Sequence, residues 1–315
     1  MSEPVLTPWA VVRDGAKLIG RFIKMHPMAF AIAVAGSTLY AGAIIAASRV
    51  IGWVTDSVII PTLDRGEEPD LLALAVVVIV GVAVLKAFGI VVRRTGAAYL
   101  SGATRRDVRN LLLAHQLTLR MSWFNRQSIG DLLAVADADT DQGTGVLGPL
   151  PFASGVSLLL VGTVVLVFAI DLWLGVGAIV GLIVAIVIDV HGSWVTFGMW
   201  EHVQKGRGRV ASIAHESFDG ALTVKALGRE GFVSKRFGEA SDDLRDRLIE
   251  VLSTWTKYQV VMRAIPQALI ILLLAVGASR VMAGAVTAGD LVTVAYLLTL
   301  LAFPIQLIGF VLWDL

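Results

Sequence analysis

Six apolar runs alternate with polar segments along the chain, and each is about as long as a membrane-spanning helix. Roughly 20 apolar residues in a helix cross the hydrocarbon core of a bilayer. The third and fourth runs are separated by little more than Asp171, which indicates a tight hairpin. The runs are Pro27–Trp53, Leu71–Val92, Leu150–Ile170, Leu172–Val190, Ile265–Val281 and Leu291–Trp313. The pattern predicts an all-α membrane protein with six transmembrane helices.

Two polar segments between these runs keep the character of helices. No proline occurs from Leu71 to Thr118, and about 48 residues of helix at 1.5 Å each reach roughly 70 Å. The hydrocarbon core accounts for only ~30 Å of that length. We expect the return helix to begin near Asp131, and a second pair to run from Leu172 to about His215 and from about Lys225 to Ser279. The sequence thus predicts two hairpins of long helices that extend well beyond the membrane.

The composition agrees with a membrane protein and excludes several kinds of site. Hydrophobic residues make up 56% of the 315 residues and charged residues 16%, against about 45–50% and 25% in soluble proteins. Mean hydropathy is +0.78. The chain has no cysteine, which excludes disulfides and thiolate metal sites. It has no G-x-x-x-x-G-K-[ST] phosphate loop, and its His and carboxylate residues lack metal-ligand or catalytic spacing. We therefore expect no metal, no catalytic residue and no nucleic-acid partner.

The basic residues predict the orientation in the membrane. Most of the 26 Lys and Arg lie before the first span, between spans two and three, or between spans four and five. The first loop on the other side holds Arg65 among four acidic residues. Because Lys and Arg concentrate in cytoplasmic loops, both termini and both long hairpins are predicted to be cytosolic. The expected location is the plasma membrane, the inner membrane of a bacterium.

The segment Trp9–Lys24 has the pattern of an amphipathic helix. Basic residues recur at helical spacing opposite an apolar face, and a helix of this kind lies along a membrane surface. The basic residues are Arg13, Lys17, Arg21 and Lys24, and the apolar ones Val12, Leu18, Ile19 and Phe22. We divide the chain into a cytosolic tail with an interfacial elbow helix, 1–26, and a six-helix domain, 27–315. The alternative of a solvated tail stays open.

The ends of the two long hairpins carry apolar side chains among polar ones. The first tip, about residues 120–130, contains Trp123, Phe124 and Asn125; the second, about residues 214–222, contains Glu216, Phe218, Asp219 and Gly220. Exposed apolar groups often mark an interaction site. We predict that both tips dock onto a soluble partner. In the alternative interpretation, Trp123 and Phe124 pack against their own hairpin.

Three segments together resemble the transmembrane domain of ABC exporters. The first tip is similar to the family's "SFFD…GDLLSRLTND" signature, although Trp123-Phe124-Asn125 replaces the aromatic pair and acid, and "ADADTD" replaces an Arg-bearing repeat. The second resembles "E…G…TVKAFGRE…RF". Its matches are Glu216, Gly220, Thr223, Val224, Lys225, Ala226, Leu227, Gly228, Arg229, Glu230, Arg236 and Phe237. The start of the sixth span is similar through Gly284, Thr287, Gly289, Asp290, Leu291, Tyr296 and Pro304.

This resemblance implies a half-transporter of the domain-swapped exporter type. Its six helices would pair with those of an identical or distinct second half, and the tips would be coupling helices. The second tip would cross to the partner half's nucleotide-binding domain. ATP and Mg²⁺ are expected on that domain, fused or separate. The sequence ends at Leu315, just past the sixth span, so the resemblance implies a chain truncated before its ATPase.

Five charged or titratable residues within or beside the spans are candidates for contact with cargo. They are Arg49, Lys86, Asp189, His191 and Arg263. Intramembrane ionisable groups are functional hypotheses by default. The last four are expected near the cytosolic interface, where Lys and Arg can snorkel and Asp189 could pair with Arg263. No pattern in the sequence favours a lipid, a drug, a peptide or a siderophore as the cargo.

Two other classes of membrane protein are weighed against the exporter. An ion-coupled secondary transporter typically has broken or polar helices at mid-membrane, whereas spans three and four are uniformly apolar. A non-transport scaffold gives no reason for two similar cytosolic tips. The sequence favours the exporter over both.

Overall fold

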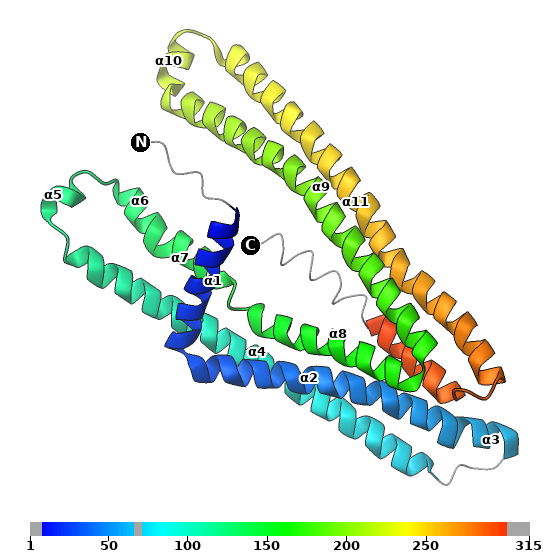
Figure 1. Cartoon of the computed structure of the whole chain (residues 1–315). Helices are drawn as coiled ribbons and strands as arrows, with labels where there is room; N and C mark the ends of the chain where they lie inside the picture. Colours follow the sequence, from blue (N-terminus) through cyan, green and yellow to red (C-terminus); the bar gives the residue numbers. More distant parts are fainter. Residues whose placement is uncertain (1–7, 66–70, 301–315) are drawn as a thin grey trace. The chain divides into compact units, whose positions relative to one another are not determined.

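The computed structural model describes residues 8–65 and 71–300, and every regular element in this part of the chain is a helix (Figure 1). In chain order the elements are α1 (Pro8–Met25), α2 (Pro27–Val54), the π-helix η1 (Thr55–Ile59), α3 (Ile60–Arg65), α4 (Leu72–Leu117), α5 (Met121–Phe124), α6 (Ile129–Ala134), the π-helix η2 (Val135–Asp139), α7 (Thr140–Gly145), α8 (Leu150–Ile170), α9 (Leu172–Asp219), α10 (Ala221–Ala226) and α11 (Glu230–Met282). A further apolar helix covers Ala288–Leu300. The all-α prediction is confirmed.

Five helical stretches are long and apolar enough to cross a membrane. They contain the first five predicted spans: Pro27–Asp64, Leu72–Leu117, Leu132–Ile170, Leu172–Asp219 and Glu230–Met282. Helix Ala288–Leu300 contains the beginning of the predicted sixth span. The rest of that span, residues 301–313, lies outside the described residues.

The predicted long helices are confirmed in α4 and α9, which have 46 and 48 residues. The return path of the first hairpin is less regular than expected. It is divided into α6, η2 and α7, and a turn at residues 146–149 precedes α8. The second return helix, α11, begins at Glu230 rather than near Lys225, because α10 forms a separate short helix before it.

Contacts divide the chain into two compact units. Among the described residues, the first comprises 8–65, 71–175 and 277–297, and the second 176–276 and 298–300. In the first unit α1 contributes Phe22 to a small apolar core with Ala29, Leu100 and Leu147. The His26 Nε2 lies 3.0 Å from Asp107 Oδ2, which ties the α1–α2 junction to α4.

Helices α2, α4 and α8 pack through small residues. A Cβ atom added to Gly89 would lie 2.9 Å from the Tyr40 nitrogen, and one added to Gly96 would lie 2.9 Å from the Ala33 nitrogen. On the α8 side, a Cβ on Gly155 would lie 2.8 Å from the Ser37 carbonyl oxygen. Close approach at small residues is the usual way in which helices associate in membranes. These contacts define the register of the three helices.

Asp171, between α8 and α9, forms hydrogen bonds both with the start of α9 and with the end of α11. Its Oδ1 accepts hydrogen bonds from the backbone N–H groups of Trp173 and Leu174, at 2.9 and 3.1 Å, and so caps α9. Its Oδ2 accepts from Arg280 Nη2 at 2.6 Å. Burial raises the pKa of Asp171, but the hydrogen bonds from Arg280, Leu174 and Trp173 outweigh it and lower the pKa below its ordinary value. The carboxylate therefore stays ionised at neutral pH.

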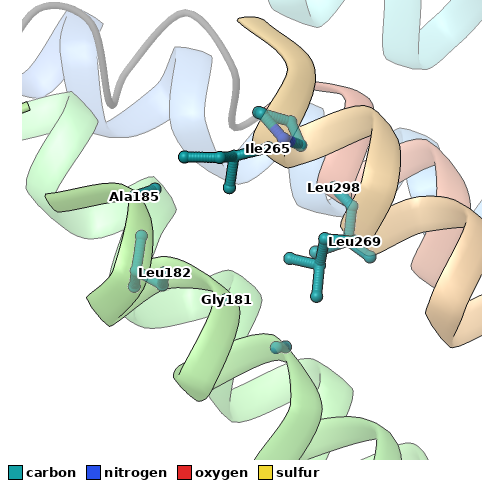
Figure 2. A pocket seen from close by; sticks show the side chains of 8 residues that line it. Gly181, Leu182, Ala185, Ile265, Leu269 and Leu298 are labelled. Atoms are coloured by element: carbon teal, nitrogen blue, oxygen red, sulfur yellow. The ribbon is translucent and has the colours of Figure 1, made fainter. Parts of the chain in front are cut away.

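The second unit is built on the long hairpin of α9 and α11. Figure 2 shows Ile265 and Leu269 of α11 opposite Gly181, Leu182 and Ala185 of α9. A Cβ atom on Gly181 would meet the Leu269 side chain. The gap between them is only about 10 Å³ and is lined by apolar residues. This part of the hairpin is a packed interface.

Candidate coupling tips and membrane charges

The second tip is an exposed apolar surface at the turn between α9 and α11. Phe218, in the last turn of α9, is 79% exposed, and Leu222 of α10 is 86% exposed. Gly228 ends this turn with a φ of 61°, a left-handed conformation that glycine adopts without a steric penalty. The Arg229 N–H then donates to the Val224 carbonyl at 3.0 Å. The chain thus presents α10 as a short, defined helix at the end of the hairpin.

A pocket of about 420 Å³ opens beside α10. It is lined by Ala214, Ser217, Phe218, Ala221, Val224, Lys225, Glu230, Val233, Ser234 and Phe237. Glu216, at the same tip, accepts from Arg236 Nη1 at 3.1 Å, so this predicted site residue joins α9 to α11. Asp219 lies 3.3 Å from His215, one turn earlier. Gly220 caps α10. Of the four predicted residues, Phe218 is therefore the one that offers a large apolar surface to a partner.

The first tip has a different arrangement from the one expected of an exposed aromatic pair. Trp123 and Phe124 pack edge to face, with ring centroids 5.3 Å apart, and both are partly buried. Asn125 is exposed and its N–H donates to the Met121 carbonyl at 3.1 Å. Met121 and Ile129 are the large apolar side chains exposed at this tip.

The unusual acidic run "ADADTD" pairs with basic residues of α4. Arg105 Nε lies 2.9 Å from Asp141 Oδ1, and Arg109 Nη2 also lies 2.9 Å from it. Arg109 also donates to Asp137, in η2. These ion pairs connect α4 to the return path of the first hairpin. Asp137 and Asp141, which belong to the run that replaces the family's Arg-bearing repeat, are therefore paired within the first hairpin.

Arg49, a candidate for contact with cargo, is engaged within the chain. Its Nη1 donates to Asp290 Oδ1 at 3.0 Å. Nearby, Asp56 Oδ1 accepts from the Gly289 N–H at 2.7 Å, and the Thr293 hydroxyl donates to the Ser48 carbonyl at 3.1 Å. Arg49 thus belongs to a polar contact that joins α2 and η1 to helix Ala288–Leu300.

Lys86 of α4 lies beside the middle of α2. Gly89 meets Tyr40, and α2 and α4 are antiparallel, so Lys86 lies level with Ala43. Ser37 meets Gly155 and Ile45 meets Gly162, which places that level near the middle of α8. The 21 residues of α8 have about the length of the hydrocarbon core. The register places Lys86 relative to α2 and α8, and its position near the cytosolic interface stays a prediction.

The remaining candidates lie in the second unit and do not form one cluster. Asp189 is buried on α9, whereas Arg263 is exposed on α11. The ion pairs between described residues do not include the Asp189–Arg263 pair that the sequence allowed. His191 contacts Tyr258, with ring centroids 5.9 Å apart. Groups of His and carboxylates that could hold a metal are absent from the described part of the chain.

Comparison with known proteins decides the class. The family model described as the ABC transporter transmembrane region matches residues 28–305. The chain belongs to this family. Together with the all-helical fold, the match confirms the resemblance to an ABC exporter transmembrane domain, and it disfavours both rival classes.

Several relatives are longer proteins whose names include ATP, and the chain matches a part of each. The chain is 24% identical over 299 residues to an ATP-dependent lipid A-core flippase of Pseudomonas putida, covering 90% of this chain and 48% of the flippase. It is 23% identical over 313 residues to the flippase of the same name of Chromohalobacter salexigens, covering 95% and 50%. Over 110 residues it is 30% identical to an uncharacterized ABC transporter ATP-binding protein, YknU, of Bacillus subtilis, covering 35% and 19%. The chain thus spans about half the length of the flippases it matches.

The sequence did not indicate every exposed group at the tips. Met121, Ile129 and Leu222 are more than three-quarters exposed, yet each looks like an ordinary core position in a helical pattern. The sequence feature that could have indicated their exposure is their position within the two segments that resemble family motifs. Exposure itself depends on how each short helix turns, which local composition does not encode.

Proposed function

We propose that this chain forms half of the translocation pathway of an ATP-driven exporter and that its two tips receive movement from nucleotide-binding domains. One observation carries the proposal: a member of the ABC transporter transmembrane family has exposed apolar tips on long helical hairpins. An exposed Phe218 beside an apolar pocket is suited to a protein contact, because large aromatic side chains are common anchors in interfaces.

A second half and lipid would complete the membrane part. Only 11% of the most apolar window of α4 is buried within this chain. Such an apolar surface is stable only when lipid or another protein covers it. In this proposal a second six-helix half, identical or distinct, pairs with the chain, and α10 reaches the nucleotide-binding domain of that other half. The nucleotide-binding domains supply the sites for ATP and Mg²⁺.

The orientation follows from the distribution of basic residues. Both tips and both termini are proposed to be cytosolic, with α1 lying along the inner surface of the plasma membrane, the inner membrane of a bacterium. The basic face of α1 suits contact with anionic head groups. Among possible cargoes, the names of the flippases that the chain resembles favour a lipid-like molecule.

Truncation of Phe218 tests the coupling role. In the full-length paired transporter, Phe218→Ala should leave membrane insertion and nucleotide binding unchanged, because the side chain lies at the tip. Cargo-stimulated ATP hydrolysis and transport should fall together by about tenfold or more, since an aromatic anchor contributes roughly 2 kcal/mol or more to an interface.

Phe197→Ala is the matched control, since Phe197 is an exposed phenylalanine of the same helix, about six turns before the tip. It should hydrolyse ATP and transport like wild type. Normal cargo-stimulated hydrolysis and transport in Phe218→Ala would exclude the second tip as the coupling element.

A further inference from the structure

The junction between α1 and α2 is tied to α4 by a polar contact between two side chains. His26 is the N-cap residue of α2, but its side chain makes no capping hydrogen bond. Its Nε2 instead lies 3.0 Å from Asp107 Oδ2, 81 residues further along the chain. Only 18% of the His26 side chain and 28% of the Asp107 side chain are exposed. The Tyr99 ring meets the imidazole edge to face, with ring centroids 6.3 Å apart. The contact is therefore partly shielded from water.

Apolar contacts attach α1 over a small area only. Among the residues of α1 whose side chains the structure describes, Phe22 is the buried one, and it packs with Ala29, Leu100 and Leu147. Met25 is partly buried against the same cluster. The other described side chains of α1 are exposed or half-buried, as expected of a helix that lies along a membrane surface. A change in one polar contact therefore alters how firmly α1 is held to α4.

The carboxylate of this contact keeps its charge over the physiological pH range. Arg106 Nε donates to Asp107 Oδ1 at 2.8 Å, which leaves Oδ2 to His26. The hydrogen bond and the charge of Arg106, together with those of His26, outweigh the effect of burial and lower the pKa of Asp107 below its ordinary value. A carboxylate whose pKa is lowered loses its favourable interactions only as the pH falls through that value, which lies below about 4. Between pH 5 and 8 the charge state of the contact is therefore set by His26.

Histidine is the side chain whose charge ordinarily changes between pH 5 and 8. A protonated imidazole forms an ion pair with the Asp107 carboxylate, whereas a neutral imidazole keeps only a hydrogen bond. Hydrogen bonds in which the partners are ionised are roughly twice as strong as neutral ones. Because the contact favours the protonated form, it is strongest at acidic pH and weakens as the pH rises through the titration of His26.

The other charged groups around His26 keep a constant charge in this range. Arg106 of α4 is bound to the far oxygen of the carboxylate, and Lys24 of α1 forms no ion pair with that carboxylate among the described residues. Helix α2 carries no charged residue before Arg49, and the turn at residues 146–149 carries none. Lysine and arginine stay protonated, and tyrosines such as Tyr99 ordinarily stay neutral, up to about pH 9. A response to pH at this junction therefore reports His26.

We propose that the contact between His26 and Asp107 is a proton-controlled latch that fastens α1 to the polar half of α4. When His26 is protonated, the ion pair and the Phe22 cluster together hold the α1–α2 junction against α4. When His26 is neutral, the apolar cluster remains, and α1 separates from α4 more often. The latch thus makes the attachment of the amphipathic helix depend on pH. It goes beyond the proposed export function and does not depend on the coupling tips.

The distance between two spin labels tests the latch. The labels are attached to Ala16→Cys on α1 and Ala114→Cys on α4, both at exposed positions. These 315 residues contain no cysteine, and any cysteine elsewhere in the full-length protein is replaced by serine. The protein, in nanodiscs of zwitterionic lipid without nucleotide, is frozen from pH 5.5 and from pH 8.0 and measured by pulsed electron paramagnetic resonance. The ratio of attached to detached α1 should fall by about threefold or more at pH 8.0, because the attraction between two charges is lost.

Four variants make the result specific to the ion pair. His26→Gln, which cannot be protonated in this range, should give the same distances at both pH values. His26→Lys, which is charged at both, should stay attached at both. Asp107→Asn should abolish the pH response although His26 still titrates, which separates the ion pair from any effect of the histidine charge on lipid head groups. His115→Gln, the same change at an exposed histidine of α4, should respond to pH like wild type.

Equal distance distributions at the two pH values in the wild-type protein would overturn the latch. A pH response that survives in His26→Gln or in Asp107→Asn would also overturn it, because the response would then come from another group. If His26→Gln does not fold, His26→Lys and Asp107→Asn still decide the question. Loss of the response in His115→Gln would assign the titration to that histidine and count against His26.

Discussion

Gly52 and Gly289 lie where the backbones of α2 and helix Ala288–Leu300 approach each other closely. A Cβ atom on Gly52 would lie 2.5 Å from the Gly289 carbonyl oxygen, and one on Gly289 would lie 2.5 Å from Asp56 Oδ2. Any side chain larger than hydrogen at either position would push the helices apart and break the hydrogen bond between Asp56 and Gly289. The polar contact that holds Arg49 thus depends on two glycines.

Gly52→Ala should destabilise the protein, because the added methyl group has no room. Overpacking of this kind costs about 1–3 kcal/mol. Gly42→Ala is the control, since a Cβ atom there meets nothing within 4 Å, and alanine is favoured over glycine in a helix by up to about 1 kcal/mol. Thermal unfolding in detergent should show a lower midpoint for Gly52→Ala and an equal or higher one for Gly42→Ala. Equal midpoints in the two variants would contradict the close contact.

Residue roles were the part of the site that the sequence predicted least well. From the sequence, Arg49 and Lys86 are both charged residues within predicted spans. In the structure Arg49 forms an ion pair with Asp290, whereas Lys86 is one of the residues that line a pocket. These differences arise from contacts between distant segments. By contrast, the motif residues Thr287 and Asp290 form a local capping box, with the Asp290 N–H donating to Thr287 Oγ1 at 3.0 Å. Such local chemistry can be read from sequence.

At the scale of elements, the first hairpin depends on cross-helix ion pairs. Between α5 and α8 the return path contains a π-helix and two short α-helices, and such irregular segments have fewer backbone constraints than one continuous helix. Arg109 reaches across from α4 to both Asp137 and Asp141. These pairs are partly exposed, so each contributes modestly, about 0.2–1 kcal/mol.

Arg109→Ala should therefore loosen the return path without unfolding the protein. Hydrogen exchange in residues 129–145 should become faster by up to about fivefold, as a loss of 1 kcal/mol or less implies. Arg106→Ala removes a neighbouring arginine whose acidic partner is the adjacent Asp107, and exchange in that variant should match wild type. Equal exchange in both variants would show that the cross-helix pairs do not order the segment.

The lengths of the long helices were predictable, and their exact ends were not. Freedom from proline and a sustained apolar pattern predicted α4 to within one residue at each end, and α9 from its first residue to within four residues of its end. The start of α11 was placed too early because Lys225, Ala226 and Leu227 are good helix formers, and the break depends on the left-handed Gly228. The π-helix η2 has no comparable signature in sequence.

At the scale of the whole molecule, the six-span plan followed from hydropathy, and the family match agrees with it. The apolar faces that this chain leaves uncovered are consistent with one half of a larger assembly. The proposed exchange of the second tip between two halves would be a property of that assembly, because it joins the tip of one chain to the nucleotide-binding domain of the other half.

We propose that the second tip transmits movement between the membrane helices and a nucleotide-binding domain of the opposite half. The most direct test is a cysteine at Ser217, which lines the pocket beside α10. It is combined with a second cysteine on the surface of the nucleotide-binding domain, in a transporter whose two halves carry different tags. The expected result is a disulfide crosslink that joins the differently tagged halves and blocks ATP-driven transport until it is reduced. A crosslink confined to one half, or a crosslinked transporter that still exports, would contradict it.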